Sequence, residues 1–381
     1  MTKRVRTIIL TEIISPYRIP VFNEITKVLK DGFKVIFLGE SEKRRAWPVR
    51  KENIRFNYQV LHGFLFQKRQ QAPYFFNPTL FFDLYRSSPE VIIVGGYQHP
   101  SYLLAVIYAK LFRRKIILWC ESNRFSDSHN ILLKEAYKRW FVRSCSGYIV
   151  PGKMSYEYLL SLGARSDKIW KAPNAVDNDY FHNSCDSKRE NAGLFKESKG
   201  YPRKIILYIG HLIDEKGVSD LLKAFSLFSK ERSDSGLLLI GSGKDEIKYR
   251  EFCAANKINN VFFAGFIDQK ELPAYYAIAD LFILPTHKDT WGLVLNEAMA
   301  CGLPVISSNA AGAAYDLIVP CENGYIFEKS NFEQLSNYLK DIFSDEQKSI
   351  AMGKKSFEIV QNYSPEKCAQ GFIEAINGVK A

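Results

Sequence analysis

Short runs of apolar residues alternate along this chain with longer segments in which apolar residues recur every three or four positions. Short apolar runs are typical of strands buried on both faces, and the longer periodic segments are typical of helices. The predicted strands are 5–10, 33–38, 91–94, 116–119 and 148–150 in the first half, and 205–209, 237–240, 261–263, 281–284 and 305–307 in the second. Because strands that alternate with helices form parallel sheets covered by helices, the pattern predicts an α/β protein with two Rossmann-like halves.

A polar stretch is predicted to separate the two halves. Residues 183–200 hold few apolar positions, which places the boundary between about 180 and 200. We therefore expect an N-terminal domain over residues 1–182 and a C-terminal domain over 200–363, followed by a terminal helix within 364–381. The length of 381 residues suits two domains of ordinary size.

The cysteines and the N-terminus favour an intracellular protein. Seven cysteines are scattered without a C-x-x-C pair, which is typical of reduced thiols. The first apolar run is interrupted at Glu12, so it favours a strand rather than a signal peptide. No stretch approaches the roughly 20 apolar residues that a spanning helix needs. We expect a cytoplasmic protein, either soluble or peripheral on the inner face of the plasma membrane.

The positive charge belongs to the first half. Residues 1–180 hold 29 Lys and Arg against 15 Asp and Glu, a net charge of +14, whereas residues 181–381 carry −3. In the densest segment, 43–69, basic and aromatic residues are interleaved: Lys43, Arg44, Arg45, Trp47, Arg50, Lys51, Arg55, Phe56, Tyr58, Phe64, Phe66, Lys68 and Arg69. This mixture suits an anionic lipid surface. Because no nucleic-acid motif is present, we favour a membrane or a lipid-diphosphate acceptor over nucleic acid. A solvated basic loop is the plain alternative.

A second segment with basic and apolar residues is 131–143, which is predicted to be a helix. Its three cations Lys134, Lys138 and Arg139 share the helix with Leu133, Tyr137, Trp140 and Phe141. An apolar stripe of this kind is more often packed in a core, so we predict core packing for it.

The stretch 287–305, HKDTWGLVLNEAMACGLPV, carries the strongest functional signal. A helix that begins at about Gly292 leaves its first backbone N–H groups unpaired, and with the helix dipole they favour phosphate. Asp289 precedes this helix and Glu297 lies within it, so the two carboxylates can bracket a ligand whose diphosphate rests on the helix N-terminus. A nucleotide sugar has that shape. The plain alternative is an acidic, solvated loop followed by a core helix.

Two loops upstream fit a phosphate ligand as well. The predicted strand 205–209 runs into a loop with Lys216 and Gly217, which is followed by an amphipathic helix. The strand 237–240 ends in Gly241-Ser242-Gly243. A single G-x-G is weak evidence alone, but strand, loop and helix in this order form an arrangement that binds phosphate.

The stretch from Asp289 to Val305 resembles the donor-site signature of the retaining family 4 glycosyltransferases, which have the GT-B fold. That family has two Glu separated by seven residues before text similar to EAMACGLPV, whereas the first acidic position here is Asp289. The resemblance implies two Rossmann-like domains facing across a cleft, with the terminal helix crossing back to the first domain. It also implies that Glu297 holds the ribose hydroxyls and Asp289 the hydroxyls of the transferred sugar.

The upstream loops follow the family's order. The family reads Gly-Arg-Leu and then Lys-Gly, and this chain has Gly210, His211, Lys216 and Gly217 at these places. Because a neutral His supplies one hydrogen bond and no charge, Lys216 is predicted to stabilise the leaving diphosphate. The other residues that the resemblance places at the donor are Gly241, Gly243, Phe266, Gly292, Leu293 and Val294.

In the first domain the resemblance is weaker. Family members often have a His after the strand that corresponds to 116–119, where this chain has Glu121. His99 follows the preceding strand and Arg18 follows the first one, so all three come after carboxyl ends of strands, where open α/β sheets bind ligands. We predict that Glu121 and His99 are catalytic residues on the acceptor side and that Arg18 meets an acceptor phosphate. A lone His beside Pro is more often structural.

The implied reaction transfers a hexose from a UDP- or GDP-sugar to a hydroxyl of a glycan or a polyprenyl-diphosphate-linked acceptor, as in bacterial surface polysaccharide or lipopolysaccharide biosynthesis. The leaving diphosphate would take the acceptor proton, so positioning and electrostatics dominate. We expect no metal or cofactor: Asp177-Asn178-Asp179 spells D-x-D but favours a turn or cap at Asp177. A nucleotide-sugar epimerase of the same fold is one alternative. A noncatalytic partner protein is the other, suggested by Asp289 and His211.

Overall fold

The computed structural model describes residues 5–40, 51–66, 74–125 and 132–381. Residues 43–50 and 67–69 of the predicted basic segment therefore lie outside the described residues. Contacts divide the chain into two compact units, Met1–Ala175 with Pro365–Ala381, and Val176–Ser364. The last helix thus belongs to the first unit although it follows the second in sequence.

The first unit is built on a parallel sheet of seven strands in the order β3-β2-β1-β6-β7-β8-β9. These strands are β1 (Thr7–Thr11), β2 (Phe33–Phe37), β3 (Tyr58–Val60), β6 (Val91–Val94), β7 (Lys115–Trp119), β8 (Gly147–Val150) and β9 (Ile169–Lys171). A separate antiparallel hairpin consists of β4 (Phe64–Phe66) and β5 (Tyr74–Phe76).

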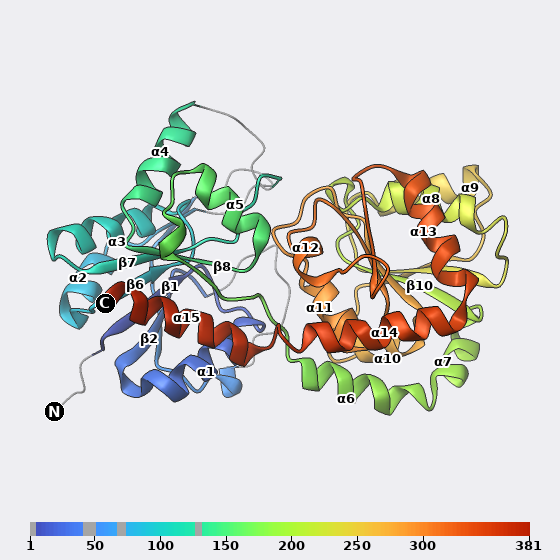
Figure 1. Ribbon diagram of the computed structural model, residues 1–381, viewed down its shortest axis with the longest axis horizontal. Coiled ribbons are helices and arrows are strands. Elements are labelled where there is room, and N and C mark those ends of the chain that lie inside the picture. Colours follow the sequence, from blue (N-terminus) through green and yellow to red (C-terminus); the bar gives the residue numbers. More distant parts are fainter. Residues whose placement is uncertain (1–4, 41–50, 67–73, 126–131) are drawn as a thin grey trace. The chain divides into compact units, whose positions relative to one another are not determined.

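Helices cover both faces of this sheet because its central strands are apolar on both sides. One face is covered by α1 (Arg18–Leu29) and α15 (Pro365–Lys380), and the other by α2 (Leu80–Ser87), α3 (Pro100–Leu111), α4 (Leu132–Arg143) and α5 (Lys153–Ser161) (Figure 1). Two successive residues of β1 pack in different cores, one on each face of the sheet. Ile9 packs in the core that contains Phe22 and Phe372, whereas Ile8 packs in the core that contains Tyr102 and Phe141.

The second unit has a parallel sheet of six strands in the order β12-β11-β10-β13-β14-β15. Its strands are β10 (Lys204–Ile209), β11 (Ser235–Ile240), β12 (Val261–Gly265), β13 (Leu281–Leu284), β14 (Val305–Ser308) and β15 (Gly324–Phe327). Its helices are α6 (Asn178–Arg189), α7 (Ala192–Lys199), α8 (Val218–Phe228), α9 (Glu246–Ala255), α10 (Leu272–Ile278), α11 (Leu293–Ala300), α12 (Ala314–Leu317), α13 (Phe332–Ser344) and α14 (Glu346–Val360). The loops between these strands and helices carry the candidate site.

Every strand predicted from the sequence is present, with ends that differ by two residues or fewer. Strands β3 and β9, the two edges of the first sheet, are not among the predicted strands. Each has three residues and is only partly buried, so neither produces a continuous apolar run. Apolar runs therefore identify the central strands of the first sheet and miss its short edges, whereas β12, an edge of the second sheet, was predicted.

The segment 183–200, predicted to be a polar linker, is largely helical instead. It falls in α6 and α7, and α6 buries Phe181 and Cys185 in the second unit. The low apolar content is that of surface helices, which need only one narrow buried stripe. Contacts place the division between the units before these helices, at Ala175 and Val176.

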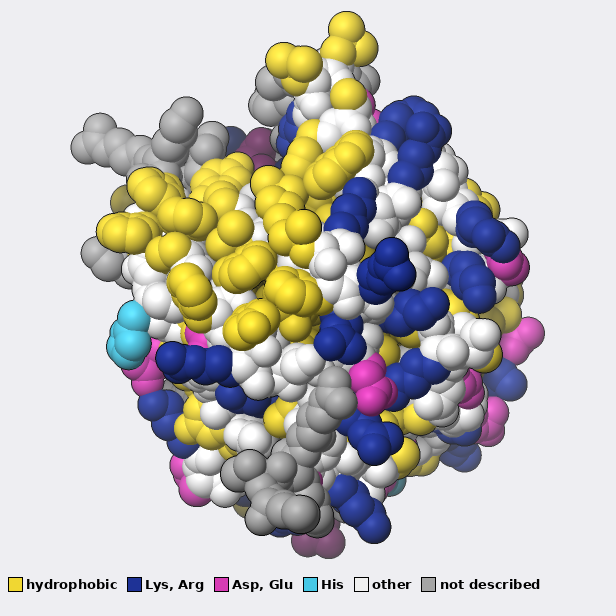
Figure 2. All heavy atoms as spheres, turned by 90° about the vertical axis from the view of Figure 1, so that its left-hand side faces the viewer, with side chains coloured by type: hydrophobic (Ala, Val, Ile, Leu, Met, Phe, Trp, Pro, Cys, Tyr) yellow, Lys and Arg dark blue, Asp and Glu magenta, His cyan; other side chains and the backbone are white. Residues whose placement is uncertain are grey.

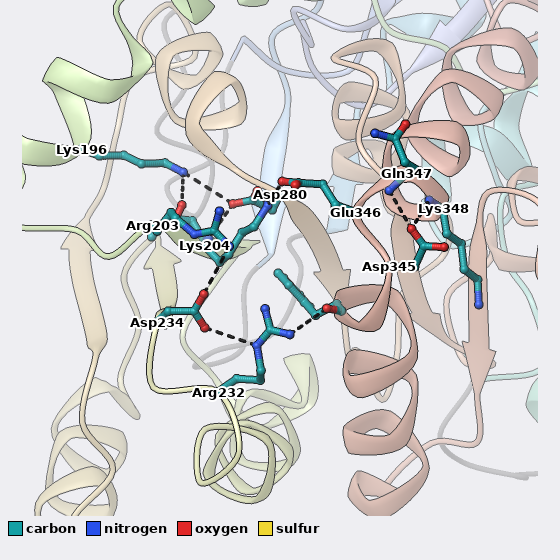
Figure 3. Close-up of polar contacts among 12 residues, drawn as sticks. Lys196, Arg203, Lys204, Arg232, Asp234, Asp280, Asp345, Glu346, Gln347 and Lys348 are labelled. Carbon is teal, nitrogen blue, oxygen red and sulfur yellow. Dashed lines mark hydrogen bonds and ion pairs between the residues drawn. The ribbon is translucent and has the colours of Figure 1, made fainter.

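Ion pairs tie α7 and α14 to the amino ends of β10 and β13 (Figure 3). Asp280, directly before β13, accepts a hydrogen bond from the backbone N–H of Ile205 at 2.8 Å. Its carboxylate lies 3.1 Å from Lys204 Nζ and 3.5 Å from Lys196 Nζ. Lys204 Nζ also lies 2.7 Å from the carboxylate of Glu346. These contacts hold α7 against the sheet of the second unit.

Asp234, directly before β11, lies between two guanidinium groups (Figure 3). Its carboxylate is 3.3 Å from Arg232 Nε and 3.6 Å from an Nη of Arg203. Burial alone would raise the pKa of Asp234, but the hydrogen bond and charge of Arg232 and the charge of Arg203 outweigh it and lower the pKa.

The predicted helix over 131–143 is present as α4, but core packing is wrong for part of its stripe. Phe141 is buried, whereas Leu133 and Trp140 are exposed.

Within the described residues, none of the helices has both the length and the apolar character needed to cross a membrane.

Candidate donor site

Two glycine loops meet at the carboxyl ends of β10 and β11. Gly241 has φ +131°, and a Cβ added to it would lie 1.9 Å from the carbonyl oxygen of Gly210. A Cβ added to Gly243 would lie 2.1 Å from the carbonyl oxygen of Leu212. Only glycine fits such close approach of backbone to backbone. The two loops therefore pack together at the edge of the sheet where α/β proteins bind ligands.

The loop before α8 is joined to the loop before α11 by an ion pair. Lys216 Nζ donates to Asp289 Oδ2 at 2.6 Å, and it lies 3.5 Å from the carbonyl oxygen of Lys288. The two charged side chains are 21% and 20% exposed, so both are in contact with solvent. Gly217, at φ +69°, permits this arrangement because a Cβ there would lie 2.0 Å from the carbonyl oxygen of Pro285.

Helix α11 begins directly after Gly292, which has φ +96° and acts as its N-cap. Helix geometry leaves the first N–H groups, those of Leu293 and Val294 included, without intrahelical acceptors. Asp289 Oδ1 accepts a hydrogen bond from the backbone N–H of Trp291 at 3.2 Å, which holds the carboxylate beside this helix end. The structure thus brings Lys216, Asp289 and the start of α11 together in the second unit.

Glu297 lies in α11 and is fully buried. Its Oε2 accepts a hydrogen bond from the hydroxyl of Tyr276 in α10 at 2.8 Å. A ribose in solvent does not reach the carboxylate in this conformation. Contact with ribose hydroxyls requires Glu297 to become accessible, so that role stays a prediction.

A second pair of polar side chains, which was not predicted from the sequence, joins the same two loops. His287 Nε2 and Asp220 Oδ2 lie 2.6 Å apart, and the backbone N–H of His287 donates to the carbonyl of Glu215 at 2.9 Å. Thr286 Oγ1 donates to the same carbonyl at 3.2 Å. The signal available in the sequence was the position of His287 only two residues before Asp289. These bonds fix the distance between the Lys216 loop and the Asp289 loop.

Two other predicted donor residues lie at the same sheet edge. His211 is exposed, and its carbonyl accepts a hydrogen bond from the buried Tyr208 hydroxyl at 2.9 Å. Burial raises the pKa of Tyr208 well above its usual value, and the charges of Tyr249 and Asp289 add to the shift, so the hydroxyl remains a donor. Phe266, directly after β12, is 63% exposed. An exposed aromatic ring at this place is free to stack on a planar ligand.

Comparison with known proteins identifies this unit. Residues 192–359 match the family model described as glycosyl transferases group 1. The match covers most of the second unit and 44% of the chain. An uncharacterized glycosyltransferase of Haemophilus influenzae is 30% identical over 165 residues, which cover 43% of this chain and 46% of that protein. The capsular polysaccharide biosynthesis glycosyltransferase CapM of Staphylococcus aureus is 28% identical over 160 residues, which cover 42% of this chain and 41% of that protein. The chain thus aligns with less than half the length of these two relatives.

Solved structures extend the likeness to the whole chain. Anabaena HepE in complex with UDP has a TM-score of 0.79 and 17% identity, and the match covers 98% of this chain and 99% of that one. At this identity the likeness shows the fold alone. The fold is GT-B, with a Rossmann-like unit on each side of the division at Ala175, and the residues that match the group 1 model lie in the second unit.

The first unit has a polar cluster of its own. Arg18, the first residue of α1, donates from Nη1 to Asn174 Oδ1 at 2.9 Å and pairs through Nη2 with the carboxylate of Glu121. Its guanidinium carbon lies 4.4 Å from the centre of the Trp119 ring. The predicted acceptor residues Arg18 and Glu121 are therefore direct partners, and the ring beneath Arg18 keeps the cluster in one position.

His99 has a different environment. It is buried, its Nδ1 accepts the backbone N–H of Phe75 at 3.2 Å, and its Nε2 lies 3.0 Å from Glu12 Oε1. Because Nδ1 accepts, Nε2 carries the proton and donates to Glu12. This geometry favours the structural alternative for His99, and a catalytic role stays an untested prediction.

The acidic residues give no metal-binding cluster in the part of the chain that the structure describes: no group of three or more His, Cys, Asp or Glu lies together there. Asp177, the first residue of the D-x-D sequence, caps α6 by accepting the backbone N–H of Tyr180 at 2.9 Å. Its predicted role as a cap is confirmed.

Proposed function

We propose that this protein is a retaining glycosyltransferase that moves a hexose from a UDP- or GDP-sugar to a hydroxyl of a glycan or lipid-linked acceptor. The observation that carries the proposal is the ion pair between Lys216 and Asp289, held beside the glycine loops and the start of α11. The match of residues 192–359 to the model of the group 1 glycosyl transferases supports the same activity.

The ion pair gives both side chains a part in donor binding. In the free protein Asp289 neutralises Lys216 at 2.6 Å. A diphosphate carries more negative charge than one carboxylate, so it would draw the ammonium group of Lys216 toward itself. Asp289 would then be free to accept hydrogen bonds from sugar hydroxyls. Lys216 and the N–H groups at the start of α11 would hold the diphosphate.

The proposed chemical step needs no protein nucleophile. The acceptor oxygen forms a bond to the anomeric carbon while the bond from that carbon to the diphosphate oxygen breaks. The acceptor proton passes to the leaving diphosphate. Lys216 stabilises the charge that develops on the diphosphate, and a positioned charge of this kind is worth about a hundredfold to a thousandfold in rate. We propose that no metal ion takes part, which predicts full turnover in the presence of EDTA.

The acceptor and the location extend the proposal. Arg18 and Glu121 are proposed to bind the acceptor, with Arg18 suited to a phosphate. The relation to a capsular polysaccharide glycosyltransferase supports a place in bacterial surface polysaccharide assembly. We propose a cytoplasmic protein that works at the inner face of the plasma membrane. Contact of the segment 43–69 with lipid stays a prediction.

A binding and turnover experiment tests the proposal. We expect UDP or GDP to raise the melting temperature, and the matching nucleotide sugar to be slowly hydrolysed. Lys216→Ala should abolish both effects, whereas Lys230→Gln, which removes an exposed lysine shortly after the end of α8, should preserve them. Stabilisation by neither nucleotide would contradict the donor site. Isomerisation of the nucleotide sugar without an acceptor would identify an epimerase instead.

A further inference from the structure

Three helices of the first unit expose large apolar side chains on their outer faces. Phe82 and Tyr85 of α2 are 66% and 60% exposed, Leu111 of α3 is 65% exposed, and Leu132 and Leu133 of α4 are 88% and 83% exposed. Figure 2 shows hydrophobic side chains gathered on the side of the molecule that carries these helices. The outer face of a surface helix is normally polar, and a continuous apolar patch marks a site of interaction.

Ring contacts join the helices into one surface. Tyr85 of α2 and Phe112, which follows α3, have ring centroids 5.6 Å apart. Lys110 of α3 places Nζ 5.0 Å from the centre of the Trp140 ring of α4. We call this surface, formed by the outer sides of α2, α3 and α4 with residues 112–113, the α2–α4 face.

The charges on the α2–α4 face are of one sign. Its exposed cations are Arg86, Lys110, Arg113, Lys134, Arg139 and Arg143. Figure 2 shows Lys and Arg side chains beside the hydrophobic ones. These three helices, all of whose residues the structure describes, contain two acidic residues. Both are partly buried and accept hydrogen bonds from neighbouring side chains. Asp83 accepts from Gln59 Nε2 at 3.3 Å, and Glu135 accepts from the buried Lys138 at 2.6 Å.

We propose that the α2–α4 face docks on a bilayer of anionic phospholipids. The apolar side chains would enter the boundary between headgroups and acyl chains, and the six cations would face the lipid phosphates. The proposal concerns a binding surface, does not depend on the sugar-transfer reaction, and does not use the segment 43–69.

Charge and side-chain type favour lipid over two other occupants. A second copy of the chain would place six cations against six cations, with no exposed acidic residue on the three helices to compensate. A nucleic acid would match the charge, but Leu132 and Leu133 have no ring to stack on a base. Their aliphatic side chains lose contact with water most favourably in an apolar medium.

Vesicle sedimentation with the full chain tests the proposal. We expect binding to vesicles of phosphatidylcholine with 30% phosphatidylglycerol, taken as roughly the anionic fraction that a polybasic surface needs, and little binding to pure phosphatidylcholine. The triple variant Arg86→Gln, Arg113→Gln, Arg139→Gln should bind on the order of a hundredfold more weakly, since each cation near the surface contributes roughly fivefold.

A second variant separates insertion from charge attraction. Phe82→Ser, Leu132→Ser, Leu133→Ser should lose the part of the binding that persists in high salt, because screening removes only the electrostatic part. Matched controls lie in the second unit: Lys199→Gln, Lys230→Gln, Lys354→Gln for charge, and Leu194→Ser with Ile247→Ser for exposed apolar side chains.

Three results would overturn the proposal. One is equal binding of the wild type to neutral and anionic vesicles, or no binding to either. Another is an equal loss of binding in the control variants. The last is self-association, or binding to single-stranded RNA, that is abolished by the same substitutions and is stronger than binding to the anionic vesicles.

Discussion

Replacing Asp289 by Asn is expected to strengthen the binding of a bare nucleoside diphosphate while it slows sugar transfer. In the free protein the carboxylate holds Lys216 at 2.6 Å, so a diphosphate that takes Lys216 must first break this pair. Asn removes the competing charge. It keeps an Oδ1 that can accept the backbone N–H of Trp291, so the loop geometry should persist.

The size of the effect follows from the exposure of the pair. Fully exposed pairs contribute roughly 0.2–1 kcal/mol, and breaking a buried pair costs about 3–5 kcal/mol. With both side chains about one-fifth exposed, the pair lies between these cases, and we expect a coupling of about 1–2 kcal/mol. UDP or GDP should therefore bind about 5-fold to 30-fold more tightly to Asp289→Asn. Turnover with the nucleotide sugar should fall because the sugar hydroxyls lose a charged acceptor.

Isothermal titration with UDP and GDP, together with kcat and KM for the nucleotide sugar, checks both directions. Asp214→Asn is the matched control, because it removes an exposed acidic charge from the loop that carries Lys216. Lys216→Ala should weaken nucleotide binding and turnover together. The reasoning is refuted if Asp289→Asn binds the bare nucleotide no more tightly than Asp214→Asn does.

Three further predictions concern the framework of the second unit. Gly241→Ala should lower the unfolding free energy by more than about 3 kcal/mol, because Gly241 has φ +131° and its Cβ would lie 1.9 Å from a carbonyl oxygen. Urea denaturation checks this. The control Gly193→Ala, which has open space in α7, should instead stabilise the protein by roughly 0.5–1 kcal/mol. Asp220→Asn should cost about 1–3 kcal/mol, because the His287 ring loses its charged acceptor, and it should raise the Kd for UDP or GDP in the same titration. Asp234 has a lowered pKa in the folded protein, so its contribution to stability is present above the unfolded pKa of about 3.9 and is lost as the pH falls through the folded value; urea denaturation between pH 6 and 3 should show a weaker pH dependence in Asp234→Asn than in the wild type.

The donor loops illustrate what local sequence can and cannot predict. Asp289 and Gly292 were singled out at the start of a predicted helix, and Lys216 in a loop between a buried strand and an amphipathic helix. The resemblance to the family gave Lys216 and Asp289 their roles at the donor. The direct bond between Lys216 and Asp289 was not predicted, because 73 residues separate them and only the register of β10 beside β13 brings their loops together. Glu297 shows a different limit. Its position in the helix was predicted, but its burial against Tyr276 depends on how α10 packs on the sheet.

The outer helices show why the pattern of apolar residues cannot predict which of them stay exposed. An apolar stripe predicts that a helix buries one side, and in α4 that side is occupied by Phe141 and Val142. The stripe does not show how many of its apolar residues the core can accommodate. Leu133 and Trp140 were therefore predicted to be buried together with Phe141. Only the sheet and its neighbours fix how much of the helix is covered. Leu133 is 83% exposed and Trp140 43% exposed, so burial in the core does not explain their apolar character, and the proposed lipid surface would explain it.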